Sequence, residues 1–154
     1  MLINDNKSAN SLEKQLRVRA KCCHPSGDYV EFKTSDLEQS IPDRFRQVVS
    51  ENDHHLAVKD FKQKLTYREL NASANRLANY ILELRQNKPE PIAILLEQGI
   101  SPIIAIFSVL TSGKFYVPLE PSYPASRTKY ILRDSGASLI LTNNENFTLA
   151  SELA

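Results

Sequence analysis

Residues Thr111 to Lys114, within the stretch TSGKFYVPLEPSYP, are of the types that hold phosphate groups in nucleotide-binding loops. A Walker A loop also needs a glycine five residues before the glycine of its Gly-Lys pair, and a serine or threonine directly after the lysine. Ser108 and Phe115 occupy those two positions, so the Walker pattern fails. We interpret the run as the end of a helix followed by the start of a strand.

Two adjacent cysteines, Cys22 and Cys23, are followed by His24 and so raise the question of a metal site. Adjacent cysteines share one tetrahedral ion poorly, and no second Cys/His pair occurs at zinc-finger spacing. We therefore predict reduced thiols that bind no metal.

The remaining titratable residues of interest are His54, His55 and Glu97. The two histidines stand in a polar turn without a carboxylate or cysteine in a recognisable pattern, so we expect them to be solvated. Glu97 closes an apolar run, and a single acid without a partner favours a surface or capping role. The sequence thus predicts no catalytic, cofactor-binding or metal-binding residue in this chain.

Composition sets the broad class. The chain has 154 residues, of which 42% are hydrophobic and 24% charged, as in a soluble globular domain. Its formal charge of +1 gives no field that would attract nucleic acid or a membrane surface. The polar N-terminus lacks the apolar run of a signal peptide, and the apolar segment 92–110 is interrupted by Glu97 and Pro102. We expect a cytoplasmic protein without a membrane or nucleic-acid partner.

The positioning elements begin at Ile41, because residues 1–40 show no sustained period and are interpreted as a leader or linker. From there segments of helical period alternate with short apolar runs. Helices are expected at 41–52, 66–85, 101–112, 124–134 and, beginning near the end of the sequence, 146–154; strands are expected at 56–61, 92–97, 115–118 and 138–142. This alternation favours an α/β domain of three layers, with a largely parallel sheet and helices on both faces.

Helix ends give the sharpest local signals. Thr66 and Glu69 have the spacing of a capping box, which stabilises a helix by about 1 kcal/mol. Ser101 and Pro102 are expected to be the N-cap and the first residue of the apolar helix. Gly113 stands where that helix needs a left-handed residue at its end.

The chain from about Ile41 to Thr142 resembles the opening part of the amino-acid adenylation domains of nonribosomal peptide synthetases, which are acyl-adenylate-forming ligases. The resemblance rests on LTYREL, on VLTSGKFYVPLEPSYPASR and on ILRDSGA, in the expected order. Thr111 and Ser112 depart from the usual Lys-Ala of the family, and Phe115, Glu120 and Thr128 also differ from its pattern.

The resemblance implies a two-step reaction in which a carboxylic acid attacks magnesium-bound ATP and the acyl group then passes to a carrier protein's phosphopantetheine. It also implies that the phosphate loop, the ribose-binding aspartate and the catalytic lysine of the family lie outside this chain. Residues 41–154 are thus expected to be a truncated N-terminal portion of an adenylation domain, inactive alone and binding no ATP or magnesium. The alternative is an interaction module that completes a split synthetase, with the rest of an adenylation domain or a synthetase subunit as partner.

Overall fold

A computed structural model describes residues 34–153 of the chain. It separates into two units, residues 1–38 and 39–154. In the first unit only a 3-10 helix, Thr34–Glu38, is described. The proposed leader therefore falls largely outside the described residues, as do Cys22 and Cys23.

The second unit is built on a parallel sheet of three strands in the order β4-β3-β5. These strands are β3 (Pro91–Leu95), β4 (Phe115–Leu119) and β5 (Ile140–Thr142). Pro91 is paired in register with Phe115, and Ala93 with Ile140. Helix α4 (Ile100–Thr111) connects β3 to β4, and helix α5 (Ala125–Ser135) connects β4 to β5.

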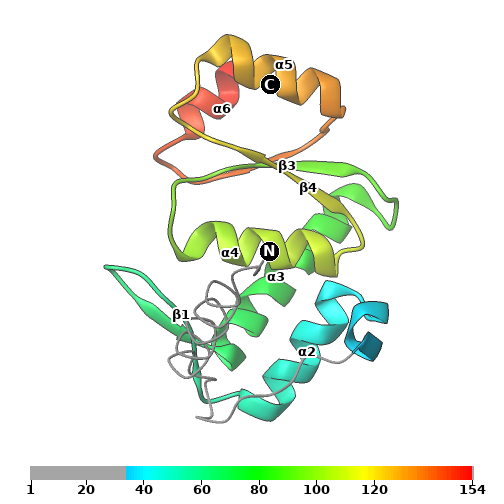
Figure 1. The fold of residues 1–154 in the computed structure, drawn as a ribbon. Helices are drawn as coiled ribbons and strands as arrows, with labels where there is room; N and C mark the ends of the chain where they lie inside the picture. The colour runs from blue at the N-terminus through cyan, green and yellow to red at the C-terminus, as the bar shows by residue number, and fades with distance from the viewer. Residues whose placement is uncertain (1–33, 154) are drawn as a thin grey trace, which may run out of the picture. The chain divides into compact units, whose positions relative to one another are not determined.

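The central strand β3 is covered by helices on both faces. Ala93 and Leu95 join one core cluster with side chains from α5 and from α6 (Phe147–Leu153). Ile92 and Ile94 join a second cluster with side chains from α4 and from α3 (Tyr67–Arg85). Figure 1 shows the sheet between these two helical layers. The predicted three-layer α/β fold with a largely parallel sheet is confirmed.

The predicted start of α3 is confirmed in detail. The Thr66 hydroxyl accepts a hydrogen bond from the Glu69 backbone N–H, and the Glu69 carboxylate accepts the Thr66 backbone N–H at 2.8 Å. Helix α2 (Ile41–Asn52) packs near this end, where Phe45 stacks on Phe107 of α4 with ring centroids 4.0 Å apart.

The first expected strand is present, but it does not belong to the parallel sheet. β1 (Leu56–Lys59) pairs antiparallel with β2 (Lys64–Thr66), a strand that the sequence analysis missed. Only four residues connect the two strands, which is too short for the crossover that parallel pairing requires. β2 was hidden because Thr66 both ends the strand and caps α3.

The expected start of α4 at Ser101 and Pro102 is wrong, because the helix begins at Ile100 after an N-cap at Gly99. The N-cap residue Gly99 has no side chain that could cap the helix. Instead, the Asp60 carboxylate in the β1–β2 turn accepts the Ile100 N–H at 3.3 Å. This acceptor lies 40 residues away in sequence, so local pattern could not reveal it.

The far end of α4 is as predicted, since Gly113 has a φ of +71°. The Gly113 N–H donates to the Leu110 carbonyl and the Lys114 N–H to the Val109 carbonyl, which together form a Schellman motif. The motif turns the chain directly into β4, and it places Lys114 just before the first residue of that strand.

Lys114 is buried at the end of the sheet where the strands begin. Its side chain has no exposed surface, and its Nζ lies 2.9 Å from the Gln86 carbonyl oxygen and 2.7 Å from that of Lys88. A third contact, of 3.2 Å, joins Nζ to the Glu90 carboxylate. The ammonium group therefore ties the start of β4 to the segment that follows α3.

Glu90 is the centre of this cluster. Its carboxylate also accepts two hydrogen bonds from Arg85, at 3.1 and 2.7 Å, and one from the Ser138 hydroxyl at 2.8 Å. The bonds from Arg85 first, and then those from Ser138 and Lys114, lower the pKa of Glu90 to about 2. Residues just before all three parallel strands are thus joined by one ionic network.

Replacing Lys114 by methionine should destabilise the fold, because it leaves two carbonyl oxygens and part of a carboxylate without a donor. We expect Lys114→Met to lower the free energy of unfolding by roughly 2–4 kcal/mol. Lys129→Met, at an exposed position of α5, is the matched control and should change it by less than about 0.5 kcal/mol. Urea denaturation measures both, and equal effects would contradict a structural role for Lys114.

The Glu90 network also predicts an acid dependence of stability. Because folding lowers the pKa of Glu90 from 4.5 to about 2, its contribution is complete above pH 4.5 and is lost as the pH falls toward 2. A shift of this size corresponds to roughly 3 kcal/mol. Unfolding free energies at pH 7 and pH 3 should differ less in Glu90→Gln than in the wild type. Glu83→Gln, at an exposed position of α3, is the control and should retain the wild-type difference.

Candidate functional site

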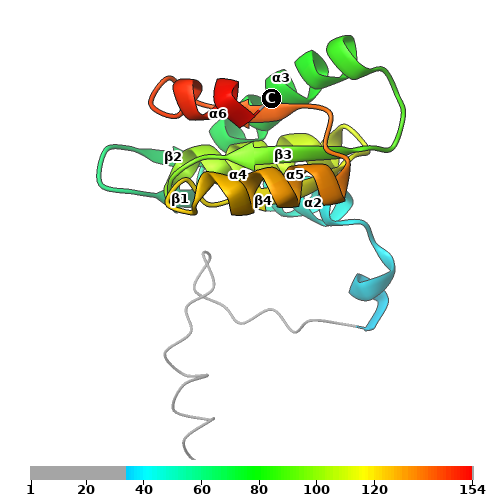
Figure 2. The ribbon, with the colours of Figure 1, turned by 90° about the horizontal axis from the view of Figure 1, so that it is seen from above.

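The carboxyl end of the parallel sheet is the candidate site. Helix α4 leaves β3 toward one face, whereas α5 and α6 leave β4 and β5 toward the other. Crevices form where neighbouring strands send their helices to opposite faces, and ligands of open α/β sheets bind there. Figure 2 shows the tip of the β1–β2 hairpin and the β5–α6 loop on the same side of the sheet.

Glu97 is the central polar residue of this edge. Its two carboxylate oxygens accept hydrogen bonds from the side-chain amides of Asn143, at 2.9 Å, and Asn146, at 2.6 Å. Its own backbone N–H and these two amides lower the pKa of the Glu97 carboxyl. Glu97 is exposed, as expected, and it joins the end of β3 to the loop that follows β5.

Asp60 closes the other side of the same edge. One carboxylate oxygen accepts the backbone N–H groups of Gln63 and Lys62, each at 2.8 Å, and the other accepts the Ile100 N–H. These bonds, with the first two dominant, lower the pKa of Asp60. A cavity of about 290 Å³ lies between the hairpin turn, the β3–α4 loop and the β5–α6 loop. Asp60 therefore occupies the N-terminus of α4, where an anionic ligand would otherwise find backbone donors.

A second cavity, of about 320 Å³, lies between the ends of β3 and β4. Its lining is mainly apolar, from Leu96, Ile106, Tyr116 and Pro118. Tyr123 also lines it and carries the Arg127 guanidinium 4.2 Å from its ring centroid. This cavity offers mainly aromatic and aliphatic surface, and the carboxylates of Glu97 and Glu120 also line it.

The run Thr111 to Lys114 does not lie at this edge. It ends α4 at the opposite end of the sheet, where helical carbonyl groups rather than N–H groups are left over. The Ser112 hydroxyl donates to the Val109 carbonyl, and Lys114 is committed to the Glu90 network. These residues do not fit a phosphate group. They end α4 and lead into β4, as the sequence analysis interpreted them.

The two histidines are exposed, as expected. The sequence offers no carboxylate in a recognisable pattern with them, but His54 Nε2 lies 3.5 Å from an oxygen of its sequence neighbour Asp53. His55 Nδ1 lies 3.1 Å from the Asn52 side-chain oxygen. Asp53 also pairs with Arg68 of α3, so the turn is part of the packing between α2 and α3.

Sequence reasoning missed Asp60, Asn143 and Asn146 as residues of this edge. The Asp-x-x-Gln turn after a short strand is a signal for an Asx turn, and could have found Asp60. The asparagines follow the last buried strand, and their partner Glu97 follows another strand 46 residues earlier. Only the strand order brings these two segments together.

Among residues 34–153, no three His, Cys, Asp or Glu side chains are grouped so that they could hold a metal ion. Within the same residues no helix has the length and apolar character to cross a membrane.

Comparison with known proteins identifies relatives in peptide synthesis. The model of the family described as AMP-binding enzyme matches residues 45–154. Gramicidin S synthase 2 of Brevibacillus brevis is 42% identical over 119 residues, which are 75% of this chain and 3% of that protein. Surfactin synthase subunit 1 of Bacillus subtilis is 38% identical over 115 residues, again 75% of this chain and 3% of the relative.

A solved structure agrees with the fold. The N-terminal subdomain of NpsA from Klebsiella oxytoca superposes with a TM-score of 0.65 at 23% identity, over 69% of this chain and 28% of that one. The chain thus spans a small part of each relative. The family match over most of the chain, together with the identity to the peptide synthetases, shows that this chain belongs to the AMP-binding enzyme family and corresponds to the N-terminal portion of a nonribosomal peptide synthetase adenylation domain.

Proposed function

We propose that this chain supplies the leading scaffold of an amino-acid adenylation domain and performs no turnover by itself. In the assembled domain, its sheet would position the segments that bind ATP, magnesium and the carboxylic acid. The reaction would be formation of an acyl-adenylate with release of pyrophosphate, followed by transfer to a carrier protein.

This proposal rests on one observation: the charged side chains near both ends of the sheet are already bonded to other groups of the chain. Lys114 and Arg85 are held by Glu90, Asp60 caps α4, and Glu97 is held by two asparagines. Catalysis of adenylate formation needs donors and a cation aimed at phosphate oxygens, in positions where charge develops. Groups that already satisfy one another inside the chain are poorly suited to that task.

A second function, an interaction module that completes a split synthetase, is favoured by a different observation. β5 lies at one edge of the sheet, and a partly apolar groove of about 410 Å³ runs beside it between α5 and α6. Apolar surface next to a strand edge is typical of a surface that another polypeptide covers.

ATP–pyrophosphate exchange tests the proposed lack of turnover. The purified 154-residue chain, given magnesium, ATP and a pool of amino acids, should show no exchange above a sample without protein. Calorimetric titration with ATP and magnesium should show no saturable binding. A complete adenylation domain of a relative is the positive control. Clear exchange by the chain alone, at a rate that depends on one amino acid, would refute the proposal.

A further inference from the structure

The cavity of about 290 Å³ at the candidate site has two walls that are held unequally. One wall is the β5–α6 loop, where Asn143 and Asn146 donate to the Glu97 carboxylate at 2.9 and 2.6 Å. The Asn146 N–H also donates to the Asn143 side-chain oxygen at 3.0 Å, and Asn146 is only 7% exposed. Three hydrogen bonds and burial therefore fix this wall.

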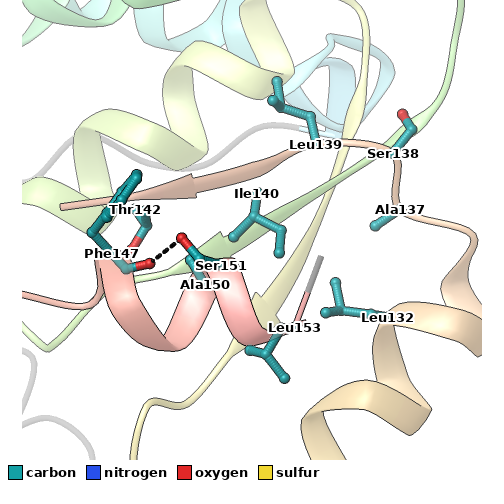
Figure 3. Close-up of a pocket in the computed structure, with 10 residues that line it drawn as sticks. All are labelled: Leu132, Ala137, Ser138, Leu139, Ile140, Thr142, Phe147, Ala150, Ser151 and Leu153. Atoms are coloured by element: carbon teal, nitrogen blue, oxygen red, sulfur yellow. Dashed lines mark hydrogen bonds between the residues drawn. The ribbon is translucent and has the colours of Figure 1, made fainter. Parts of the chain in front are cut away.

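Helix α6 adds to the stability of the fixed wall, because the β5–α6 loop leads directly into it. Figure 3 shows Ala150 and Leu153 of this helix near Leu132 of α5, and all three belong to one core cluster. The Ala150 N–H donates to the Asn146 carbonyl at 2.8 Å. Movement of this loop would thus disturb the core.

The opposite wall is the β1–β2 turn, residues 60–63, which is held more weakly. Within residues 34–153, the structure shows a single hydrogen bond from this turn to the far side of the cavity, the 3.3 Å contact between the Ile100 N–H and the Asp60 carboxylate. The side chain of Phe61 is fully exposed, so it adds no buried apolar surface. A segment with so few buried contacts can open locally at low cost in free energy.

The turn is nevertheless rigid within itself. One Asp60 carboxylate oxygen accepts the N–H groups of Lys62 and Gln63, each at 2.8 Å, and the Asp60 N–H donates to the Gln63 carbonyl at 3.0 Å. These bonds do not involve α4, so they can persist while the turn moves. Farther along the hairpin, Val58 and Leu65 are paired and partly buried, which confines the movement to the turn and the strand residues next to it.

Helix α4 offers no cap of its own that could replace Asp60. Its N-cap, Gly99, has no side chain, and its first turn contains no acidic residue. Gly99 has a φ of +153°, which residues with a side chain rarely adopt, and a Cβ there would lie 3.4 Å from an Asp60 carboxylate oxygen. The positive end of the helix therefore attracts the Asp60 carboxylate, and this attraction closes the cavity.

Lys62 adds a second, weaker attraction across the cavity. After the Glu97 backbone N–H and the two asparagine amides, the charge of Lys62 also lowers the pKa of Glu97, which belongs to the fixed wall. Because Lys62 is exposed, salt should screen this attraction. The closed state of the turn thus depends on one hydrogen bond and one screened pair of charges.

We propose that the β1–β2 turn is a clasp that closes this cavity, with Asp60 as its latch on α4. In the open state the Asp60 carboxylate leaves the Ile100 N–H, and the turn moves away with its internal hydrogen bonds intact. The Ile100 side chain, which lines the cavity and is 1% exposed when the clasp is closed, then meets solvent. The clasp controls access to the carboxyl end of the sheet, and it is independent of the proposed lack of turnover.

Nuclear magnetic resonance of the full chain tests the clasp with two readouts, amide exchange and the relaxation that a neutral, soluble gadolinium chelate causes at the Ile100 methyl groups. Asp60→Asn is the decisive variant, because its side-chain oxygen can keep the turn bonds while its NH₂ group faces the Ile100 N–H and cannot accept it. Asp60→Ala removes both acceptors and covers the case in which asparagine turns its oxygen toward α4. Phe61→Ser changes an exposed residue of the same turn and is the matched control. Thermal unfolding checks the fold of each variant.

In Asp60→Asn we expect the Ile100 amide to exchange roughly fivefold to tenfold faster, as loss of a helix cap predicts, while the Lys62 and Gln63 amides keep their wild-type rates. Gadolinium relaxation of the Ile100 methyl groups should rise about twofold or more, because the open clasp exposes them. In the wild type a smaller rise should follow when salt is raised from about 0.05 to about 1 M, which screens the charge of Lys62. Phe61→Ser should match the wild type.

Unchanged Ile100 exchange in both Asp60 variants, or an equal rise in Phe61→Ser, would overturn the inference. Faster exchange without increased relaxation would also overturn it, because Asp60 would then be a helix cap and not the latch of a movable turn.

Discussion

The structure depends on the burial of β3 from both faces. A parallel strand in this position can be stable only if helices cover it above and below, and here the sequence of β3 is apolar at every position that the two core clusters need. Helices α4 and α5 meet this requirement, because they cover opposite faces of the sheet. The Glu90 network then joins the segments just before the three strands. The loops of the candidate site lie at the opposite end of the sheet.

Local patterns in the sequence predicted most of the fold. The capping box at Thr66 and Glu69, and the left-handed residue Gly113, are written within a few residues of the chain, and both were predicted correctly. The start of α4 and the hairpin partner of β1 were missed, because their causes lie elsewhere. Asp60 caps α4 across 40 residues, and β2 was read as part of a helix cap.

The candidate site was less predictable than the fold. The sequence predicted a structural role for Thr111 to Lys114. It did not reveal the partners of the Lys114 ammonium group, which are Glu90 and two backbone carbonyls in the segment after α3. Similarly, Glu97 and Asn146 come together only when β5 lies beside β3. Long-range pairing therefore decides which polar groups of this edge hold one another. Within residues 34–153, the outer side of β5 pairs with no other strand.

Amide hydrogen exchange, resolved residue by residue in the isolated full chain, tests this account most directly. Ile92 to Leu95 should exchange slowly, since β3 is paired on both sides, and Leu141 should be protected by β3. The amides of Ile140 and Thr142 should exchange much faster than that of Leu141, because they face the open edge. Protection of Ile140 and Thr142 equal to that of Leu141, or rapid exchange throughout β3, would contradict the central claim that β3 is buried between two paired strands and that the outer side of β5 is unpaired.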